Sequence, residues 1–204
     1  MNAGYDDGYK ACPCFWGKKP GSLVKKLSLK LGSLSNFKVL DVGCGEGKNA
    51  IFMAERDAQI IAIDISKPAL KNAVNLWPHC PNIMWHQADI RYFSLDCGPF
   101  DIVILYGVLH CLSSYQEIIK VVERLKSATT PFGYHIVCTF NNREQNLTPH
   151  PGLNPILISH NDYLKLYQNW QIFNASDSDL WEVHPHNNIY HMHSMTRFIA
   201  SKRM

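Results

Sequence analysis

The sequence predicts an α/β protein with a mostly parallel sheet and helices on both faces. Three observations support this prediction. Short apolar runs alternate with segments of helical periodicity over residues 38–140, as in strands buried on both faces. The first run leads into closely spaced glycines at 43, 45 and 47, which suit a bare backbone turn that a ligand approaches. The length of 204 residues, 46% of them hydrophobic, is enough for one well-buried core.

The individual elements follow from residue spacing. Leu23, Leu27 and Leu31 recur at helical spacing and predict a helix over residues 21–31. The alternating units are strands at 38–42, 59–64, 83–86, 101–106 and 133–140, and helices at 47–55, 67–76 and 114–127. Strands that alternate with helices predict parallel pairing.

The pattern changes after Phe140. Residues 141–155 form a polar segment that contains proline and is expected to be a loop, and residues 160–167 are expected to be a helix. Two further runs, 170–176 and 192–200, have β-like composition and predict a terminal hairpin.

The glycine turn indicates the class of ligand. A dinucleotide fingerprint would place its third glycine at position 48, where this chain has Lys48. Asp41 precedes the first glycine by two, and its carboxylate would repel a diphosphate but attract an ammonium group. S-adenosylmethionine carries an ammonium group and no phosphate. Asp41, Gly43, Gly45 and Gly47 are therefore predicted to bind this cofactor.

Two further carboxylates follow later strands. Asp64 ends an apolar strand about twenty residues after the glycine turn, the distance at which a βαβ unit returns a carboxylate to two ribose hydroxyls. It could instead cap the next helix, for which Ser66 is the better candidate. Asp89 offers an acceptor for an adenine amine and Ile90 an apolar contact for the ring, although Asp89 could also be a surface acid. The predicted cofactor residues of the core are Asp41, Gly43, Gly45, Gly47, Asp64, Ile65, Asp89, Ile90 and Tyr106.

The sequence resembles the class I S-adenosylmethionine-dependent methyltransferases through residues 39–50, 62–66 and 100–110. Within that class it is most similar to the tellurite-resistance (TehB-like) small-molecule methyltransferases, through residues 15–20 and 190–202. The resemblance implies a Rossmann-like sheet of seven strands, the last one antiparallel. It also implies an N-terminal lid, on which Tyr9 and Trp16 are expected to contact the cofactor pocket.

The resemblance implies the organisation and activity as well. We expect a single domain over residues 1–204, with an N-terminal lid and helix (1–35), a cofactor-binding core (36–140) and a substrate-side helix and hairpin (141–204). The expected reaction is in-line transfer of a methyl group to a small molecule, namely a thiol, a chalcogen oxyanion, or an oxygen or nitrogen acceptor of a natural product. A nicotinamide-dependent oxidoreductase and a non-catalytic S-adenosylmethionine sensor or scaffold are the alternatives.

Histidines are the candidate catalytic residues. His110 follows the fourth predicted strand, at a position that the resemblance places beside the transferred methyl group. His184 and His191 belong to the C-terminal region that, by the same resemblance, closes the substrate side. These three are predicted to orient or deprotonate the acceptor, without a choice among them.

A metal site is the alternative use of the histidine-rich hairpin. His191 and His193 would point to one face of a strand, which is compatible with metal binding. The hairpin histidines, including His184 and His186, lack a fixed ligand spacing, so pocket lining or an exposed loop is favoured and no metal is expected. Cys12-Pro13-Cys14 could supply soft ligands, but a surface loop with two thiols is preferred.

Composition limits which binding partners and which cellular compartment we expect. Seven cysteines, an odd number, favour reduced thiols in the cytoplasm, and a net charge of +3 without an aromatic-interleaved basic run disfavours nucleic acid. Residues 105–108 also lack the Pro-Pro-aromatic motif of DNA amino-methyltransferases. The polar opening at residues 1–8 is unlike a secretory leader, and no apolar run approaches the roughly 18 residues of a membrane span. We expect a small-molecule acceptor and no membrane association; the sequence indicates no oligomeric state.

Overall fold

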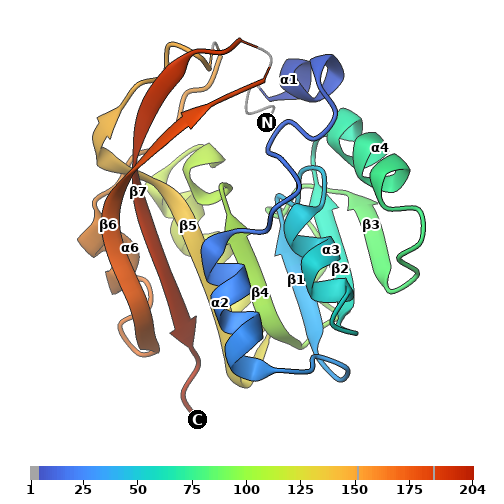
Figure 1. Ribbon diagram of the computed structural model, residues 1–204. Coiled ribbons are helices and arrows are strands. Elements are labelled where there is room, and N and C mark those ends of the chain that lie inside the picture. Colours follow the sequence, from blue (N-terminus) through green and yellow to red (C-terminus); the bar gives the residue numbers. More distant parts are fainter. Residues whose placement is uncertain (1–4, 151, 186) are drawn as a thin grey trace.

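Seven strands form one sheet in the order β3-β2-β1-β4-β5-β7-β6 (Figure 1). This computed structural model describes residues 5–204 except 151 and 186. The strands are β1 (Lys38–Val42), β2 (Gln59–Asp64), β3 (Ile83–Gln87), β4 (Phe100–Tyr106), β5 (Thr129–Gln145), β6 (Gln171–Val183) and β7 (Tyr190–Ser201). Strands β3, β2, β1, β4 and β5 pair in parallel, whereas β7 runs antiparallel to both β5 and β6. The predicted fold class, including the antiparallel terminal strand, is confirmed.

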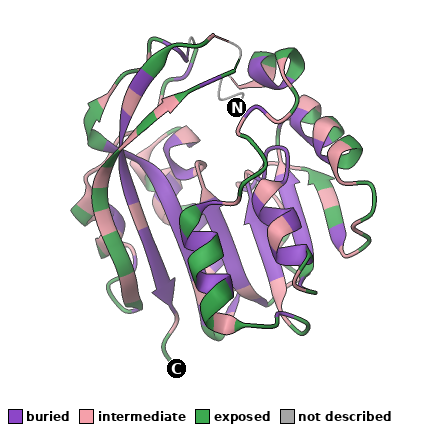
Figure 2. Ribbon diagram, viewed as in Figure 1, coloured by how far each residue is buried: buried purple, intermediate pink, exposed green. Residues whose placement is uncertain are grey.

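Helices cover both faces of the sheet, as Figure 1 shows. They are α1 (Asp6–Ala11), α2 (Ser22–Leu31), α3 (Lys48–Ala54), α4 (Lys67–Leu76), α5 (Tyr115–Ser127), α6 (His160–Lys165) and the 3-10 turn η1 (Leu109–Cys111). Alternate residues of β1 enter different cores: Leu40 packs with the apolar face of α5, and Val39 packs with α2 and α3. This period of two explains why the central strands are buried throughout (Figure 2).

The sequence prediction differs from the structure mainly at the ends of the last strands. Strand β5 continues to Gln145, five residues into the expected loop, and β6 continues to Val183. Polar contacts and an aromatic pair hold these extensions: Arg143 pairs at 2.7 Å with both Asp177 and Asp179, and the Trp181 ring stacks on Tyr190. The hairpin therefore extends beyond the sheet towards α1 (Figure 1). Helix α1 was not expected, because its six residues are too short to show helical periodicity.

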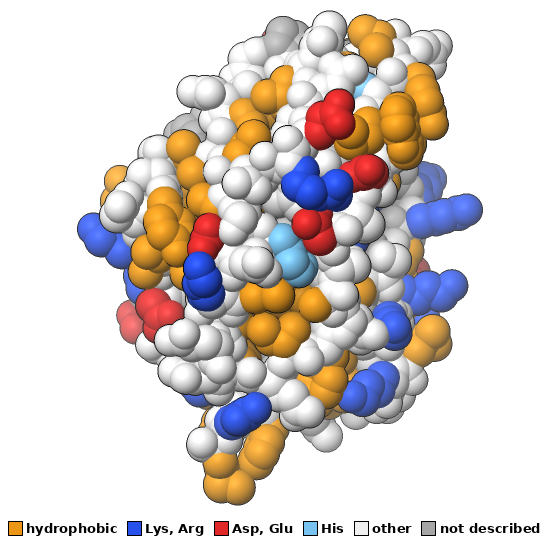
Figure 3. Space-filling model, turned by 90° about the vertical axis from the view of Figure 1, so that its left-hand side faces the viewer, with side chains coloured by type: hydrophobic (Ala, Val, Ile, Leu, Met, Phe, Trp, Pro, Cys, Tyr) orange, Lys and Arg blue, Asp and Glu red, His pale blue; other side chains and the backbone are white. Residues whose placement is uncertain are grey.

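The side of the molecule formed by β6 and β7 carries acidic and basic side chains interspersed with apolar ones (Figure 3). On that face the two signs of charge are mixed, so it lacks the single-sign field typical of a nucleic-acid surface. Among the described residues, no helix combines the length and the apolar character needed to cross a bilayer.

Candidate cofactor and acceptor site

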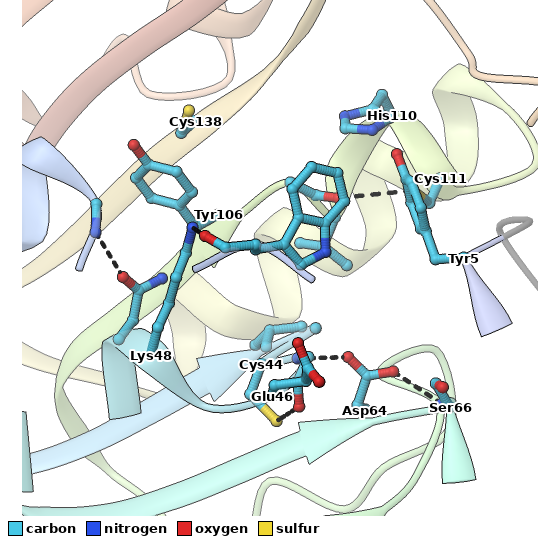
Figure 4. Close-up of a pocket in the computed structure, with 18 of the residues that line it drawn as sticks. Tyr5, Cys44, Glu46, Lys48, Asp64, Ser66, Tyr106, His110, Cys111 and Cys138 are labelled. Atoms are coloured by element: carbon cyan, nitrogen blue, oxygen red, sulfur yellow. Dashed lines mark hydrogen bonds between the residues drawn. The ribbon is translucent and has the colours of Figure 1, made fainter. Parts of the chain in front are cut away.

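A cavity of about 630 Å³ lies beyond the carboxyl ends of β1, β2 and β4. In Figure 4, Asp64 and Ser66 lie on one side of it, and His110 and Cys138 lie on the other. Ten of the predicted site residues line the cavity: Tyr9, Trp16, Gly43, Gly45, Asp64, Ile65, Asp89, Ile90, Tyr106 and His110. Four do not line it: Asp41, Gly47, His184 and His191.

The glycine turn after β1 has a conformation that requires glycine. Gly43, Gly45 and Gly47 have φ values of 63°, 55° and 81°, in the left-handed region. A Cβ atom at Gly47 would stand 2.3 Å from the Trp85 ring, so this glycine serves packing against β3. Gly43 and Gly45 instead leave bare backbone at the cavity wall.

Asp64 is held in position by the glycine turn. Its carboxylate accepts hydrogen bonds from the Gly45 and Ser66 backbone N–H groups, both at 2.8 Å (Figure 4). Burial raises the pKa of Asp64, and these backbone hydrogen bonds oppose the rise. Each oxygen keeps a free acceptor position, because a carboxylate offers about four. A fixed carboxylate at the cavity edge fits the two hydroxyls of a ribose. Ser66 caps α4, as expected, by accepting from Ala69 N–H.

Asp41 lies beneath the turn rather than at the cavity wall. It is 1% exposed, and neither carboxylate oxygen has a hydrogen-bond partner of good geometry among the described residues. Burial, and then the charge of Asp64, raise the pKa of Asp41 to about 8. A buried carboxyl group without a partner fits a ligand with an ammonium group, reached through water rather than directly.

Asp89 already has a partner. Its two oxygens accept hydrogen bonds from the Arg91 backbone and guanidinium, at 2.9 Å for the backbone and Nε contacts. Although burial raises the pKa of Asp89, these bonds and the charge of Arg91 outweigh it and lower the pKa. An adenine amine would have to share this carboxylate with Arg91. Arg91 was not predicted from the sequence, although its position two residues after Asp89 could have indicated that the two side chains pair.

The N-terminal segment forms part of the cavity wall and is fastened to the glycine turn. Glu46 accepts the backbone N–H groups of Cys14 at 2.9 Å and Phe15 at 2.6 Å. Asn72 of α4 bridges the Glu46 carboxylate at 2.8 Å and the Tyr9 carbonyl at 2.7 Å. The Trp16 indole donates to the Tyr9 hydroxyl at 3.0 Å.

Lys48 also contacts this segment: its Nζ donates to the Trp16 carbonyl at 3.1 Å (Figure 4). Sequence reasoning treated position 48 only as a missing glycine and did not single out Glu46. Both belong to the glycine motif, but their partners lie about 30 residues away and carry no local signal.

His110 belongs to η1 and is buried against β5. Its Nδ1 accepts the Phe140 backbone N–H at 3.3 Å and lies 3.1 Å from Thr139 Oγ1. The ring proton is therefore on Nε2, which has no partner among the described residues. Burial, with a smaller contribution from His150, lowers the pKa of His110 to about 3. The neutral ring is a poor base, and its Nε2–H is left to donate to a ligand.

His184 and His191 lie outside the cavity wall, contrary to the expectation that they line the pocket. They are buried, at 2% and 1% exposure, in a cluster that we call the four-histidine cluster: His150, His184, His191 and His193. His186 lies outside the described residues. The sequence analysis missed His150, which comes from the loop after β5. Glu182 touches both the cluster and the cavity.

Three cysteines line the cavity: Cys44, Cys111 and Cys138 (Figure 4). None of the seven cysteines forms a disulfide. Burial raises the pKa of all three cavity thiols, that of Cys111 to about 12.

Known proteins are similar to this chain in sequence. Residues 39–133 match the family described as "Methyltransferase domain". An uncharacterized methyltransferase of Mycobacterium tuberculosis is 36% identical over 102 residues, which cover 50% of each chain. A ubiquinone biosynthesis O-methyltransferase of Acinetobacter baylyi is 30% identical over 119 residues, covering 56% of this chain and 48% of its own. The chain thus spans about half the length of these curated relatives.

Solved structures agree on the fold. TehB of Haemophilus influenzae superposes with a TM-score of 0.75 at 15% identity, over 90% of this chain and 62% of its own. The N-methyltransferase NodS of Bradyrhizobium japonicum, in complex with S-adenosyl-L-homocysteine, gives a TM-score of 0.67 at 14% identity, over 96% of this chain and 98% of its own.

Proposed function

We propose that this chain, whose residues 39–133 belong to the class I S-adenosylmethionine-dependent methyltransferase family, transfers a methyl group from S-adenosylmethionine to a small molecule. One observation carries the proposal: a single cavity joins the glycine turn and Asp64 to His110. Cofactor-binding groups and an acceptor-orienting group therefore share one enclosed space.

The cofactor end is assigned from the groups already present there. The turn at Gly43 and Gly45 admits the amino-acid part of the cofactor, and buried Asp41 attracts its ammonium group through water. Asp64 accepts the ribose hydroxyls from its fixed position. Ile90, buried and at the cavity wall, packs against the adenine ring, whose amine shares Asp89 with Arg91.

The residues at the His110 end of the cavity orient the acceptor, and none of them is assigned as a base. S-adenosylmethionine carries an already activated methyl group, so the protein contributes proximity and alignment for an in-line displacement. The His110 Nε2–H donates a hydrogen bond that positions the acceptor. The N-terminal segment, through Trp16, excludes water from the same space. An acceptor that must lose a proton loses it to solvent or enters already deprotonated.

The acceptor itself is a small molecule: a thiol, a chalcogen oxyanion, or an oxygen or nitrogen group of a natural product. A cavity of about 630 Å³ supports this choice, because small-molecule sites typically enclose about 300–1,000 Å³ and this one must also hold the cofactor. Seven unpaired cysteines support work in the reducing cytoplasm.

Transfer of labelled methyl from S-adenosylmethionine to a panel of thiols, selenite, tellurite, amines and phenols tests the proposal. Volatile labelled product would identify a thiol or chalcogen acceptor, and non-volatile product an oxygen or nitrogen acceptor. The Asp64→Ala variant serves as the blank for cofactor-dependent turnover. Binding of the cofactor without transfer to any acceptor would contradict the proposal and favour a sensor.

A further inference from the structure

The four-histidine cluster brings ring nitrogens unusually close together. The Nε2 atom of His150 lies 3.1 Å from that of His191, 3.1 Å from that of His193 and 3.2 Å from that of His184. Glu182 Oε1 completes the group, 3.6–3.8 Å from the Nε2 atoms of His184, His191 and His193. All four imidazoles are at most 6% exposed. One ligand atom from each of His150, Glu182, His191 and His193 lies within 4.8 Å of the others, and His184 Nε2 borders this group, so potential ligand atoms converge in a space that excludes most water.

The tautomers of two rings are fixed from outside the cluster. His191 Nδ1 lies 2.8 Å from the Ile189 carbonyl, which only accepts, so Nδ1 carries the proton. His193 Nδ1 lies 2.9 Å from Gln145 Oε1. The Gln145 amide nitrogen already donates to two backbone carbonyls, of Asn141 and Ser194, each at 2.8 Å. The amide orientation is therefore set, and His193 Nδ1 is also a donor.

Hydrogen bonds between neutral rings do not account for the resulting geometry. Both His191 and His193 direct an unprotonated Nε2 towards His150 Nε2, which has at most one proton. That proton can point along only one of the two contacts, so the other brings two lone pairs to 3.1 Å. A cation between the nitrogens removes this repulsion. Two nitrogens about 2.1 Å from a metal, at 90–109° to one another, are separated by about 3.0–3.4 Å, which matches the observed spacing.

We infer that the four-histidine cluster and Glu182 form a binding site for one divalent transition-metal ion. Imidazole nitrogens suit zinc, iron, nickel and copper, and one carboxylate reduces the ion's charge. The hydrogen bonds that His191 and His193 donate from Nδ1 to the Ile189 carbonyl and Gln145 Oε1 would hold both rings in the orientation that metal binding needs. This inference goes beyond the methyl transfer proposed above and does not depend on it.

The ion would fasten segments that are far apart in the sequence. His150 comes from the loop after β5, and the remaining ligands come from β6, β7 and the turn between them. Phe15 and Trp16 of the N-terminal segment stack on or abut the His184 ring, with centroids 5.0 and 4.9 Å away. Glu182 lines the cavity. Metal binding is therefore expected to stabilise the hairpin as the far wall of the cofactor and acceptor cavity.

Calorimetric titration of the chelator-treated full chain with Zn²⁺ tests the site, together with the visible absorption of the Co²⁺ form. We expect one tightly bound ion per chain and a higher Tm. The His191→Gln variant should bind Zn²⁺ more than about 100-fold more weakly. Loss of a group that only hydrogen-bonds to a ligand already lowers metal affinity roughly 10–100-fold, and this variant loses a ligand itself. Gln145→Leu removes the hydrogen-bond partner of His193 but no ligand, so its Zn²⁺ affinity should fall by roughly 10–100-fold.

Three controls accompany the Zn²⁺ titration. His79→Gln alters an exposed histidine and should leave Zn²⁺ affinity unchanged. A Cys12→Ser, Cys14→Ser double variant should also bind normally, and loss of binding there would overturn the assignment in favour of the cysteines. A far-UV circular dichroism spectrum of His191→Gln that matches that of the natural chain would show that this variant is folded. Equal Zn²⁺ binding by His191→Gln and the natural chain, or no binding by either, would refute the site whether or not methyl transfer is found.

Discussion

Two buried carboxyl groups dominate the electrostatics around the glycine turn. Asp41 has no hydrogen-bond partner of good geometry among the described residues, whereas Asp64 is held by two backbone N–H groups. The same burial therefore has different consequences. Asp64 is positioned to accept hydrogen bonds, and Asp41 carries a desolvation penalty that a cationic ligand would relieve.

Asp41 makes a pH-dependent contribution to stability. The pKa of Asp41 is about 8 in the folded chain, above the ordinary 3.8, so between these values the folded state retains a proton that the unfolded state has released. The free energy of unfolding should therefore fall as pH rises through this window, by up to about 1.4 kcal/mol per pH unit. Asp41→Asn should become progressively more stable than the natural chain over the same range. Urea unfolding of both proteins at several pH values checks this; a constant difference would contradict it.

Asp64 makes the strongest residue-level prediction for cofactor binding. Asp64→Ala is expected to weaken S-adenosyl-L-homocysteine binding at least about tenfold, because it removes a charged acceptor for the ribose hydroxyls. Isothermal titration calorimetry measures the effect. Asp96→Ala, at an exposed position, is the matched control and should leave the dissociation constant unchanged. An unaltered constant for Asp64→Ala would refute the ribose assignment.

The residue-level predictions that coincide with the cavity came from local sequence signals. Gly43, Gly45 and Asp64 lie in short motifs, and the structure places all three at the cavity. His150 and Glu182 were missed, because they join the other histidines only through the pairing of β6 with β7 and a loop that precedes both. Asp89 was assigned to a ligand without its partner Arg91.

At the scale of elements, the Glu46 carboxylate is one of the groups that fasten the N-terminal segment. Glu46→Gln leaves one acceptor oxygen where two now receive the Cys14 and Phe15 N–H groups. Loss of one charge-assisted hydrogen bond should accelerate S-adenosyl-L-homocysteine dissociation roughly tenfold or more. Stopped-flow tryptophan fluorescence measures this rate. Glu55→Gln, on the exposed end of α3, should dissociate at the natural rate, and a similar rate in Glu46→Gln would argue against a closing segment.

The central elements could be predicted closely, and the peripheral ones could not. Strands β1 and β2 have the predicted bounds, because apolar runs flanked by turn residues fix both ends. The extension of β5 is polar and that of β6 mixes polar with apolar residues, so their strand character depends on pairing with β7. Such pairing joins distant residues and leaves no periodic pattern in the sequence.

For the whole molecule, the predicted fold is confirmed and residues 39–133 match a methyltransferase-domain family, and the remaining question is which ligand stabilises the chain. S-adenosyl-L-homocysteine at about 100 times its dissociation constant should raise the free energy of unfolding by about 2.7 kcal/mol, because it binds only the folded state. Thermal unfolding with and without the ligand checks this. A nicotinamide dinucleotide should produce no shift, since Lys48 replaces the third glycine of its fingerprint. A shift with the dinucleotide instead would reverse the ligand assignment.

The cavity thiols could be methylated by the proposed cofactor. A sulfonium methyl donor alkylates thiolates, and Cys44, Cys111 and Cys138 all border the space it would occupy. Burial raises the pKa of each of these groups, so they persist as thiols, which are weak nucleophiles. Burial of these thiols would thus protect the proposed methyltransferase from self-alkylation, and an acceptor that arrives as an anion would meet no competing thiolate among these three cavity cysteines.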